Sequence, residues 1–509
     1  MVEGRSAVNT AAPWPTVVEA EARVLHVQTK FHKWATTDQT QQFHDLFNLV
    51  CDRATLVVAW QRVRTNRGSR TAGVDGITRR DVEQRVGVER FLDGIRSSVK
   101  DGSYRPQPVR ERMIPKAGGK LRRLGIATLR DRVVQMALKL VLEPIFEPDQ
   151  YRSSYAYRPG RRAQDAVAEI VHFVNNGYEW VVEGDVEACF DTIEHRSVVE
   201  QLRTRVTDRR VLGLCKAFLR AGVLTELGRL ERTVTGTPQG GIVSPLFANL
   251  ALHAALDEHF QSVWAAQSRY RSQRNYLRSK GHATYRLIRY SDDFVLMVSG
   301  TREQAAALKA DTARLLARHG LRLSEHKTLI THVDEAFDFL GFRIQRRPRQ
   351  GKTPCAYTFM SKAAFERTKH KVKALTRRHT RNLSLQQLLH AINPILRGVA
   401  HYFRHAAVKH TLHYLAYYAW WRVMRWLRAK HPQANWTWMR RRYFGKDGIA
   451  EAGVTLFRPD SVAVTRYRYR GANIATPWNA EILTANRAAF RRVIDEPPRL
   501  EQLQLRLTE

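Results

Sequence analysis

Apolar residues recur at intervals of three and four along the first part of the chain. Between residues 17 and 64 they include Leu25, Phe31, Trp34, Phe43, Leu46, Leu49, Leu56 and Trp60. This spacing is typical of helices that bury one face. The same pattern predicts a helix that opens near Asp131, a helix over Thr301–His319 that stops at Gly320, and a mostly helical region from about 361 to 444.

Other apolar stretches are short and bounded by turn residues, which is typical of strands. The segment Tyr104–Gly125 predicts two strands around an AGGK turn. WVVEGDVEACF, Trp180–Phe190, predicts a buried strand that runs into a turn, and Ile288–Val298 predicts two strands joined at a polar tip. Further strands are expected around Phe337–Ile344. The interior therefore mixes helix and sheet.

Composition narrows the class of protein. The 509 residues are 43% hydrophobic and 26% charged, which suits a globular chain of several domains. We expect no membrane span, because no apolar run reaches about 18 residues, and no secretory signal, because the first residues lack an apolar segment. The four cysteines form no C-x-x-C pair, so neither a disulfide framework nor a zinc ribbon is expected, and a reduced cytosolic setting fits.

Charge is distributed unevenly. The formal net charge is +36, and residues 343–509 hold 33 Lys plus Arg against 9 Asp plus Glu, a net of +24. A polyanionic partner would offset this excess, and nucleic acid is favoured over an anionic membrane. Any single basic cluster, such as Lys362–Arg381, has the alternative of a solvated helix face. Aromatic residues interleave with these bases; most at His413–Trp426 have the spacing of core residues, and the others could stack on nucleic-acid bases.

Three carboxylates stand beside apolar strands. Asp185 ends one predicted strand, and Asp292 and Asp293 form the predicted hairpin tip. Carboxylates in such places are usually paired or metal-bound, and adjacent ones repel each other unless a cation neutralises them. Oxygen ligands of this kind suit Mg²⁺. A polar β-turn is the alternative, since Asp also favours turns.

A further motif brings these residues into a family. GTPQGGIVSPLFANL joins a Pro-Gln-Gly-Gly loop to a helix start, and VEGDVEACFDTIEH, GTPQGGIVSPLFANL, RYSDDFVLMV, GLRLSEHKT and FDFLGFR follow the order of the palm motifs of reverse transcriptases. Together they resemble the group II intron-encoded reverse transcriptases and maturases over about residues 25–480. RMIPKAGGKLRRLGIATLRDRVVQ looks like that family's fingers, and NPILRGVAHYFRH, WWRVMRWLRAKHP and RRRYF look like its thumb.

The resemblance implies an α+β fold built as a right-hand polymerase. It divides the chain into an N-terminal extension (1–80), fingers and palm with an antiparallel palm sheet (81–345), an α-helical thumb or maturase domain (346–445) and a basic DNA- or RNA-binding tail (446–509). Because no C-x-x-C follows residue 342, we expect the form that lacks the endonuclease domain.

The resemblance also implies roles for single residues. Asp185 and Asp292, with the main-chain carbonyl of Val186, are the expected ligands of two Mg²⁺ ions, and Asp293 completes the acidic cluster. The expected nucleotide-binding residues are Lys116, Arg122, Phe190, Gln239 and Lys327. The Phe190 ring would exclude a 2′-hydroxyl, with an ordinary core Phe as the alternative. The expected RNA or DNA contacts are Arg377, Arg378, Arg397, Arg404, Arg440, Arg441 and Arg442.

By the same resemblance the chain is an RNA-directed DNA polymerase that also binds its intron RNA to assist splicing and mobility. The expected partners are group II intron RNA, target DNA, an RNA template–DNA primer duplex and dNTPs, in a bacterial cytoplasmic ribonucleoprotein and not at a membrane. A non-catalytic RNA-binding splicing factor, or a domesticated reverse transcriptase in phage defence or spacer acquisition, are the alternatives. One departure from the family is that Arg123 and Ala127 replace two prolines of the fingers, which predicts a looser loop.

Overall fold

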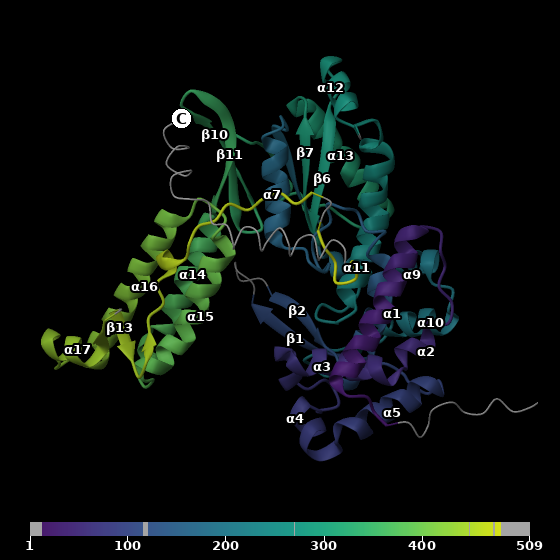
Figure 1. Cartoon of the computed structure of the whole chain (residues 1–509), viewed down its shortest axis with the longest axis horizontal. Helices are drawn as coiled ribbons and strands as arrows, with labels where there is room; N and C mark the ends of the chain where they lie inside the picture. Colours follow the sequence, from purple (N-terminus) through teal and green to yellow (C-terminus); the bar gives the residue numbers. More distant parts are fainter. Residues whose placement is uncertain (1–12, 116–120, 269, 447, 472–473, 480–509) are drawn as a thin grey trace, which may run out of the picture.

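The computed structural model describes residues 13–115, 121–268, 270–446, 448–471 and 474–479. Figure 1 shows a larger body, formed by the N-terminal helices and a central sheet, and a smaller helical body made by the C-terminal third of the chain. The N-terminal helices are α1 (Val17–Thr37), α2 (Phe47–Val50), α3 (Arg53–Thr65), α4 (Arg79–Asp81), α5 (Val88–Lys100) and α6 (Leu129–Phe146).

Helices α1, α3 and α6 pack against one another in the largest hydrophobic core. The Thr16 side chain and Glu19 form a capping box that starts α1, which satisfies amides that the first turn leaves unpaired. The predicted helical periodicity of residues 17–64 is confirmed in part: Phe31, Leu56 and Trp60 are buried on these helices. Leu25 and Trp34 are exposed, and the buried Phe43 and Leu46 lie between α1 and α2.

A small sheet lies beside these helices. Its strand order is β2-β1-β4-β5, with β1 (Val109–Pro115), β2 (Leu121–Ile126), β4 (Val223–Leu224) and β5 (Leu230–Glu231). Strand β1 runs antiparallel to β2, as the sequence predicted. The guanidinium of Arg123, one of the two residues that replace prolines, pairs with Glu111 and Glu231 across the sheet.

The central sheet has the order β6-β7-β3-β8, with β6 (Thr284–Tyr290), β7 (Asp293–Ser299), β3 (Trp180–Asp185) and β8 (Ile330–His332), all antiparallel to their neighbours. Successive residues face opposite sides. Val182 and Leu296 join the core shared with α11 (Ser244–Leu252) and α13 (Arg302–Arg318), whereas Val181 and Val295 pack with α7 (Ala163–Val174). The expected mixed fold with antiparallel sheets is confirmed.

The remaining helices of the larger body are α8 (Cys189–Thr192), α9 (His195–Arg205), α10 (Arg209–Leu219) and α12 (Arg271–Ser279). A third sheet, β9 (Phe337–Phe339), β10 (Phe342–Arg349) and β11 (Lys352–Met360), leads to the smaller body. That body contains α14 (Lys362–Leu375), α15 (Leu385–Phe403), α16 (Lys409–Lys430) and α17 (Trp436–Tyr443), with the short strands β12 (Phe444–Gly445), β13 (Gly448–Glu451) and β14 (Val454–Thr455).

The smaller body has a hydrophobic core of its own, to which α15 and α16 contribute most of the apolar side chains. After β14 the chain returns to the larger body (Figure 1). We call residues 457–479 the strap. Its Arg470 bonds Asp165 on α7, and the Trp478 indole donates to Gln28 on α1. Within the described ranges, no helix is long and apolar enough to cross a membrane.

Candidate active site

The three carboxylates singled out in the sequence meet at one end of the central sheet. Asp185, the last residue of β3, lies opposite Asp293, the first residue of β7, in the antiparallel register. Facing residues of such strands have Cα atoms about 4.5–5.5 Å apart. The Val186 amide donates to the Asp292 carbonyl at 3.3 Å, which joins the two segments. The fold therefore brings together residues more than 100 positions apart.

The turn that carries Asp292 is held in place by the buried side chain of Arg289. Ser291 has a φ of 62°, in the left-handed region that non-glycine residues seldom adopt. Arg289 donates to the Ser291 carbonyl at 3.3 Å and to the Asn249 side chain at 3.1 Å. Its guanidinium also forms a buried ion pair with Asp257 at 2.6 Å. The Arg289 contacts hold the turn to the core.

Burial alone would raise the pKa of Asp257, but the Arg289 guanidinium and the His253 side chain together outweigh burial and hold this pKa below its usual value. Arg289, Asn249 and Asp257 were not recognised in the sequence as parts of the site. Asn249 lies inside the quoted GTPQGGIVSPLFANL motif, which was the available signal.

Lys327 provides a positive charge at the cluster. Its Nζ lies 2.8 Å from Asp185 Oδ2, and the hydrogen bond to Asp185 raises the Lys327 pKa. Asp293 keeps exposed surface, yet the surrounding protein and then the charges of Asp292 and Asp185 raise the pKa of its carboxyl to about 7. Mutual repulsion of this kind is what a bound cation relieves.

The donor set suits Mg²⁺ in its chemistry, because it consists of carboxylate oxygens and a main-chain carbonyl. Within the described residues, no group of three or more His, Cys, Asp or Glu side chains is arranged to hold a metal ion as it stands. Asp185 is instead paired with the Lys327 ammonium.

A chain of hydrogen bonds connects the small sheet to α8, the helix that follows β3 of the central sheet. Arg122 on β2 donates from Nε to Gln239 Oε1 at 2.8 Å, and Gln239 Nε2 donates to Asp191 on α8 at 3.4 Å. The Thr237 amide donates to the Phe190 carbonyl at 2.7 Å, which fixes the Pro-Gln-Gly-Gly loop to α8. Arg122 and Gln239 are thus brought together, whereas Lys116 lies outside the described residues.

Phe190 is buried and belongs to the largest core. In the free chain its ring occupies the position expected of an ordinary core residue, and α8 places it just after the Asp185 strand. A neighbouring constraint was missed in the sequence. A Cβ on Gly184 would lie 2.2 Å from the Phe294 ring, so only glycine fits beside that ring in this register.

The arginines expected to contact RNA or DNA lie on the smaller body. Arg377, Arg378, Arg397 and the α17 residues Arg440, Arg441 and Arg442 are exposed, and Arg404 is half-buried. Arg397 lies over the Phe457 ring at 5.0 Å, and Arg442 pairs with Glu451 at 3.3 Å. Within the part of the chain that the structure describes, no hydrogen bond or ion pair links them to the carboxylates.

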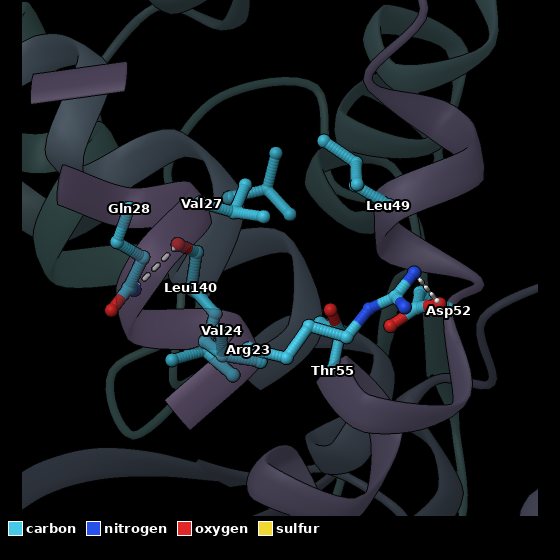
Figure 2. Close-up of a pocket in the computed structure, with 9 residues that line it drawn as sticks. Arg23, Val24, Val27, Gln28, Leu49, Asp52, Thr55 and Leu140 are labelled. Atoms are coloured by element: carbon cyan, nitrogen blue, oxygen red, sulfur yellow. Dashed lines mark hydrogen bonds and ion pairs between the residues drawn. The ribbon is translucent and has the colours of Figure 1, made fainter. Parts of the chain in front are cut away.

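One pocket lies elsewhere, between α1, α3 and α6 (Figure 2). It is lined mainly by aliphatic side chains and closed at one side by the ion pair between Arg23 and Asp52, at 3.1 Å. Gln28 Nε2 donates to the Leu140 carbonyl at 2.7 Å (Figure 2). Because its polar groups are already paired, this pocket offers no chemistry comparable with that of the carboxylates.

Comparisons with known proteins agree with the order of the motifs. Residues 114–344 match the family described as reverse transcriptase (RNA-dependent DNA polymerase), and residues 365–444 match the one described as group II intron, maturase-specific domain. Protein YkfC of Escherichia coli (strain K12) is 35% identical over 347 residues, which cover 65% of this chain and 90% of that protein.

Two more distant likenesses follow. The group II intron-encoded protein LtrA of Lactococcus lactis subsp. cremoris is 29% identical over 448 residues, covering 74% of this chain and 72% of that protein. A solved telomerase from Candida albicans, in complex with a fragment of telomeric RNA, has a TM-score of 0.37 and 14% identity, covering 67% of this chain and 63% of that chain. A likeness this weak carries no argument.

Proposed function

The chain belongs to the group II intron reverse transcriptase and maturase family, and from this premise we propose that it is an RNA-directed DNA polymerase that also binds its intron RNA to assist splicing and mobility. The observation that carries the polymerase half is the meeting of Asp185, Asp292 and Asp293 beside Lys327. Neither a splicing factor without catalysis nor a solvated turn needs that arrangement.

In this proposal the acidic cluster holds the metal. Asp185, Asp292 and the Val186 carbonyl would be the ligands, and Asp293 would add charge at the same edge. Two bound Mg²⁺ ions would supply activation of a primer 3′-hydroxyl and neutralisation of the departing pyrophosphate. Lys327 carries a proton at Nζ and lies 2.8 Å from Asp185, and this position at the carboxylates makes it our candidate for protonating pyrophosphate.

Other residues would bind and orient the nucleotide. Arg122 donates from a strand that faces the loop of Gln239, so a triphosphate between them would meet a guanidinium suited to phosphate oxygens. Lys116 is assigned the same task from its motif alone. Gln239 would lie by the template base, and Phe190 would exclude ribonucleotides only if its ring edge reaches the sugar.

We assign the RNA-binding half to the smaller body. Its exposed arginines and the +24 excess of residues 343–509 would neutralise phosphates of the intron RNA. In this scheme residues 1–80 form the N-terminal extension, 81–345 the fingers and palm, 346–445 the thumb and 446–509 the tail. Binding energy, rather than side-chain chemistry, would bias the RNA toward its active fold.

Primer extension on an RNA template tests the proposal. The protein with Mg²⁺ and dNTPs should yield cDNA, and Asp292→Ala should abolish it while leaving the affinity for RNA unchanged. The matched control is Asp311→Ala, which removes a carboxylate of α13 whose partner is the exposed Arg314. Full extension by Asp292→Ala would refute the assignment of the carboxylates.

A further inference from the structure

Four arginines gather at the end of the central sheet from which β6 starts, beside α12 (Figure 1). Arg286 on β6 is 6% exposed, Arg274 and Arg278 on α12 are half-buried, and Arg152 is exposed. The Arg286 guanidinium lies 5.3 Å from the Phe173 ring and 5.8 Å from the Tyr178 ring, and that of Arg278 lies 5.0 Å from Tyr178. We call these four residues the arginine cluster.

Buried arginines normally pair with a carboxylate, and three members of the cluster do not in the part of the chain that the structure describes. Within the described residues, Arg152, Arg278 and Arg286 form no ion pair. Arg286 donates to the carbonyls of Tyr285 and Ser268, and Arg278 donates to that of Asn176 at 3.2 Å. The Nε atoms of Arg278 and Arg286 are buried without a hydrogen-bond partner.

Arg289, three residues further along β6, provides the contrast. It is buried as well but is neutralised by Asp257. A buried cation without an anion is costly in folding free energy, so the buried Arg286 with further arginines beside it indicates a ligand of opposite charge.

The electrostatics agree with this geometry. Burial, and then the neighbouring charges of Arg286, Arg278 and Arg152, lower the pKa of Arg274, although Tyr178 opposes them. Burial and Arg274 likewise lower the pKa of His172. The buried carboxyl of Glu169 lies near Arg152 but forms no ion pair with Arg152, Arg278 or Arg286 within the described residues, and its oxygens accept hydrogen bonds from Ser153, Tyr155 and Tyr469.

We propose that the arginine cluster, with His172 and the Tyr469 ring stacked on it at 4.6 Å, binds a backbone phosphate of the intron RNA. Guanidinium groups match phosphate oxygens, and aromatic rings beside them suit a polynucleotide better than a small anion. The cluster lies six residues from Asp292 along β6, or about 20 Å, so its phosphate is not one of those at the candidate active site. This inference rests on the RNA-binding half of the proposed function and gives it a location outside the smaller body.

The test compares two double variants of α12. Arg274→Gln with Arg278→Gln removes two charges from the cluster, whereas Arg271→Gln with Lys280→Gln removes two exposed charges from the same helix and the turn after it. The probe is a labelled RNA oligonucleotide, titrated at several salt concentrations. The cluster variant should bind about tenfold more weakly, with a log–log salt slope shallower by about 1, and the control variant should lose much less.

Three further readouts keep the outcomes separate. Extension of a preformed template–primer duplex at saturating concentration should be unchanged in the cluster variant; if the wild-type protein makes no cDNA, the polymerase proposal fails and the RNA site stands. Melting temperatures check that each variant is folded. If the double variant of the cluster does not fold, the single variant Arg278→Gln takes its place. Pyrophosphate, at matched ionic strength, tests for a small-molecule ligand.

Equal affinity and slope in the wild type and the cluster variant would overturn the proposal. So would an equal loss in the control variant, which would indicate a diffuse basic surface. Stabilisation of the wild type but not of the cluster variant by pyrophosphate, with RNA binding unaltered, would assign the site to a small phosphate compound instead.

Discussion

The ionisation of the Asp293 carboxyl is opposed by the negative charges of two neighbouring carboxylates. Burial, together with Asp292 and Asp185, raises the pKa of its carboxyl from 3.8 to about 7. Without a divalent cation, the folded protein therefore binds a proton there that the unfolded chain has already released. The stability contributed by this proton is fully present below the unfolded pKa and is lost as pH rises through about 7.

Asp293→Asn should remove that pH dependence, because the amide is neutral at every pH. In the presence of a chelator, we expect the melting temperature of the variant to exceed that of the wild type at pH 8 and to match it more closely at pH 5. Thermal unfolding at both pH values measures the difference. An identical gap at pH 5 and pH 8 would show that the Asp293 carboxyl is not the titrating group.

At the scale of single residues, the sequence indicated the groups that carry charge next to apolar strands. Asp185, Asp292 and Lys327 could be predicted because motifs surround them. The supports of the turn could not, since Arg289 and Asp257 are 32 positions apart and only the fold brings them together. The positive φ of Ser291 could not be predicted either, because serine seldom adopts this conformation.

The β6–β7 hairpin is held to the core by the buried ion pair between Arg289 and Asp257. Asp257→Ala would leave the Arg289 guanidinium buried without an anion, which costs about 3–5 kcal/mol in unfolding free energy. Chemical denaturation measures this cost, and nucleotide incorporation should fall as well because Arg289 also holds the Ser291 carbonyl.

Asp311→Ala is the matched control for the hairpin, since its pair with Arg314 is exposed and is worth less than about 1 kcal/mol. A loss for Asp257→Ala no larger than that of this control would show that water reaches Arg289 and that the hairpin does not depend on the pair.

Among the elements, those long enough to show a regular apolar pattern could be predicted from the sequence. The β6 and β7 strands are continuous runs of buried residues, and α13 and α16 bury apolar residues at helical spacing. Both patterns are visible in the sequence. The two-residue strands β4, β5 and β12 have no period of their own and exist through pairing with a neighbour. The order of strands in each sheet also follows from tertiary packing alone.

At the scale of the whole molecule, the strap joins the two bodies. Asp165 on α7 is buried and accepts hydrogen bonds from the Tyr467 hydroxyl and from two nitrogens of Arg470, at 2.6 and 2.8 Å. The sequence suggested only a basic tail that binds nucleic acid. A sequence does not distinguish an arginine that pairs with a distant carboxylate from one that faces solvent. Arg470 and Tyr467 are turned to the protein instead.

Arg470→Ala should release the strap, since Asp165 loses its two charged hydrogen bonds at a cost of about 1–3 kcal/mol. Limited proteolysis should then cut within residues 457–479 faster than in the wild type. Arg466→Ala, which removes an exposed arginine of the same segment, should leave the rate unchanged. Equal protease resistance of Arg470→Ala and the wild type would mean that other contacts fix the strap.

The central claim is that the carboxylates at the end of β3 and in the β6–β7 turn form a polymerase centre. Single-turnover incorporation of one dNTP, on a DNA primer paired with an RNA template, tests it most directly. Asp185→Asn should slow incorporation by about a thousandfold without weakening binding of the duplex, and Asp311→Asn should have no effect. An Asp185→Asn rate within tenfold of the wild type would contradict the claim.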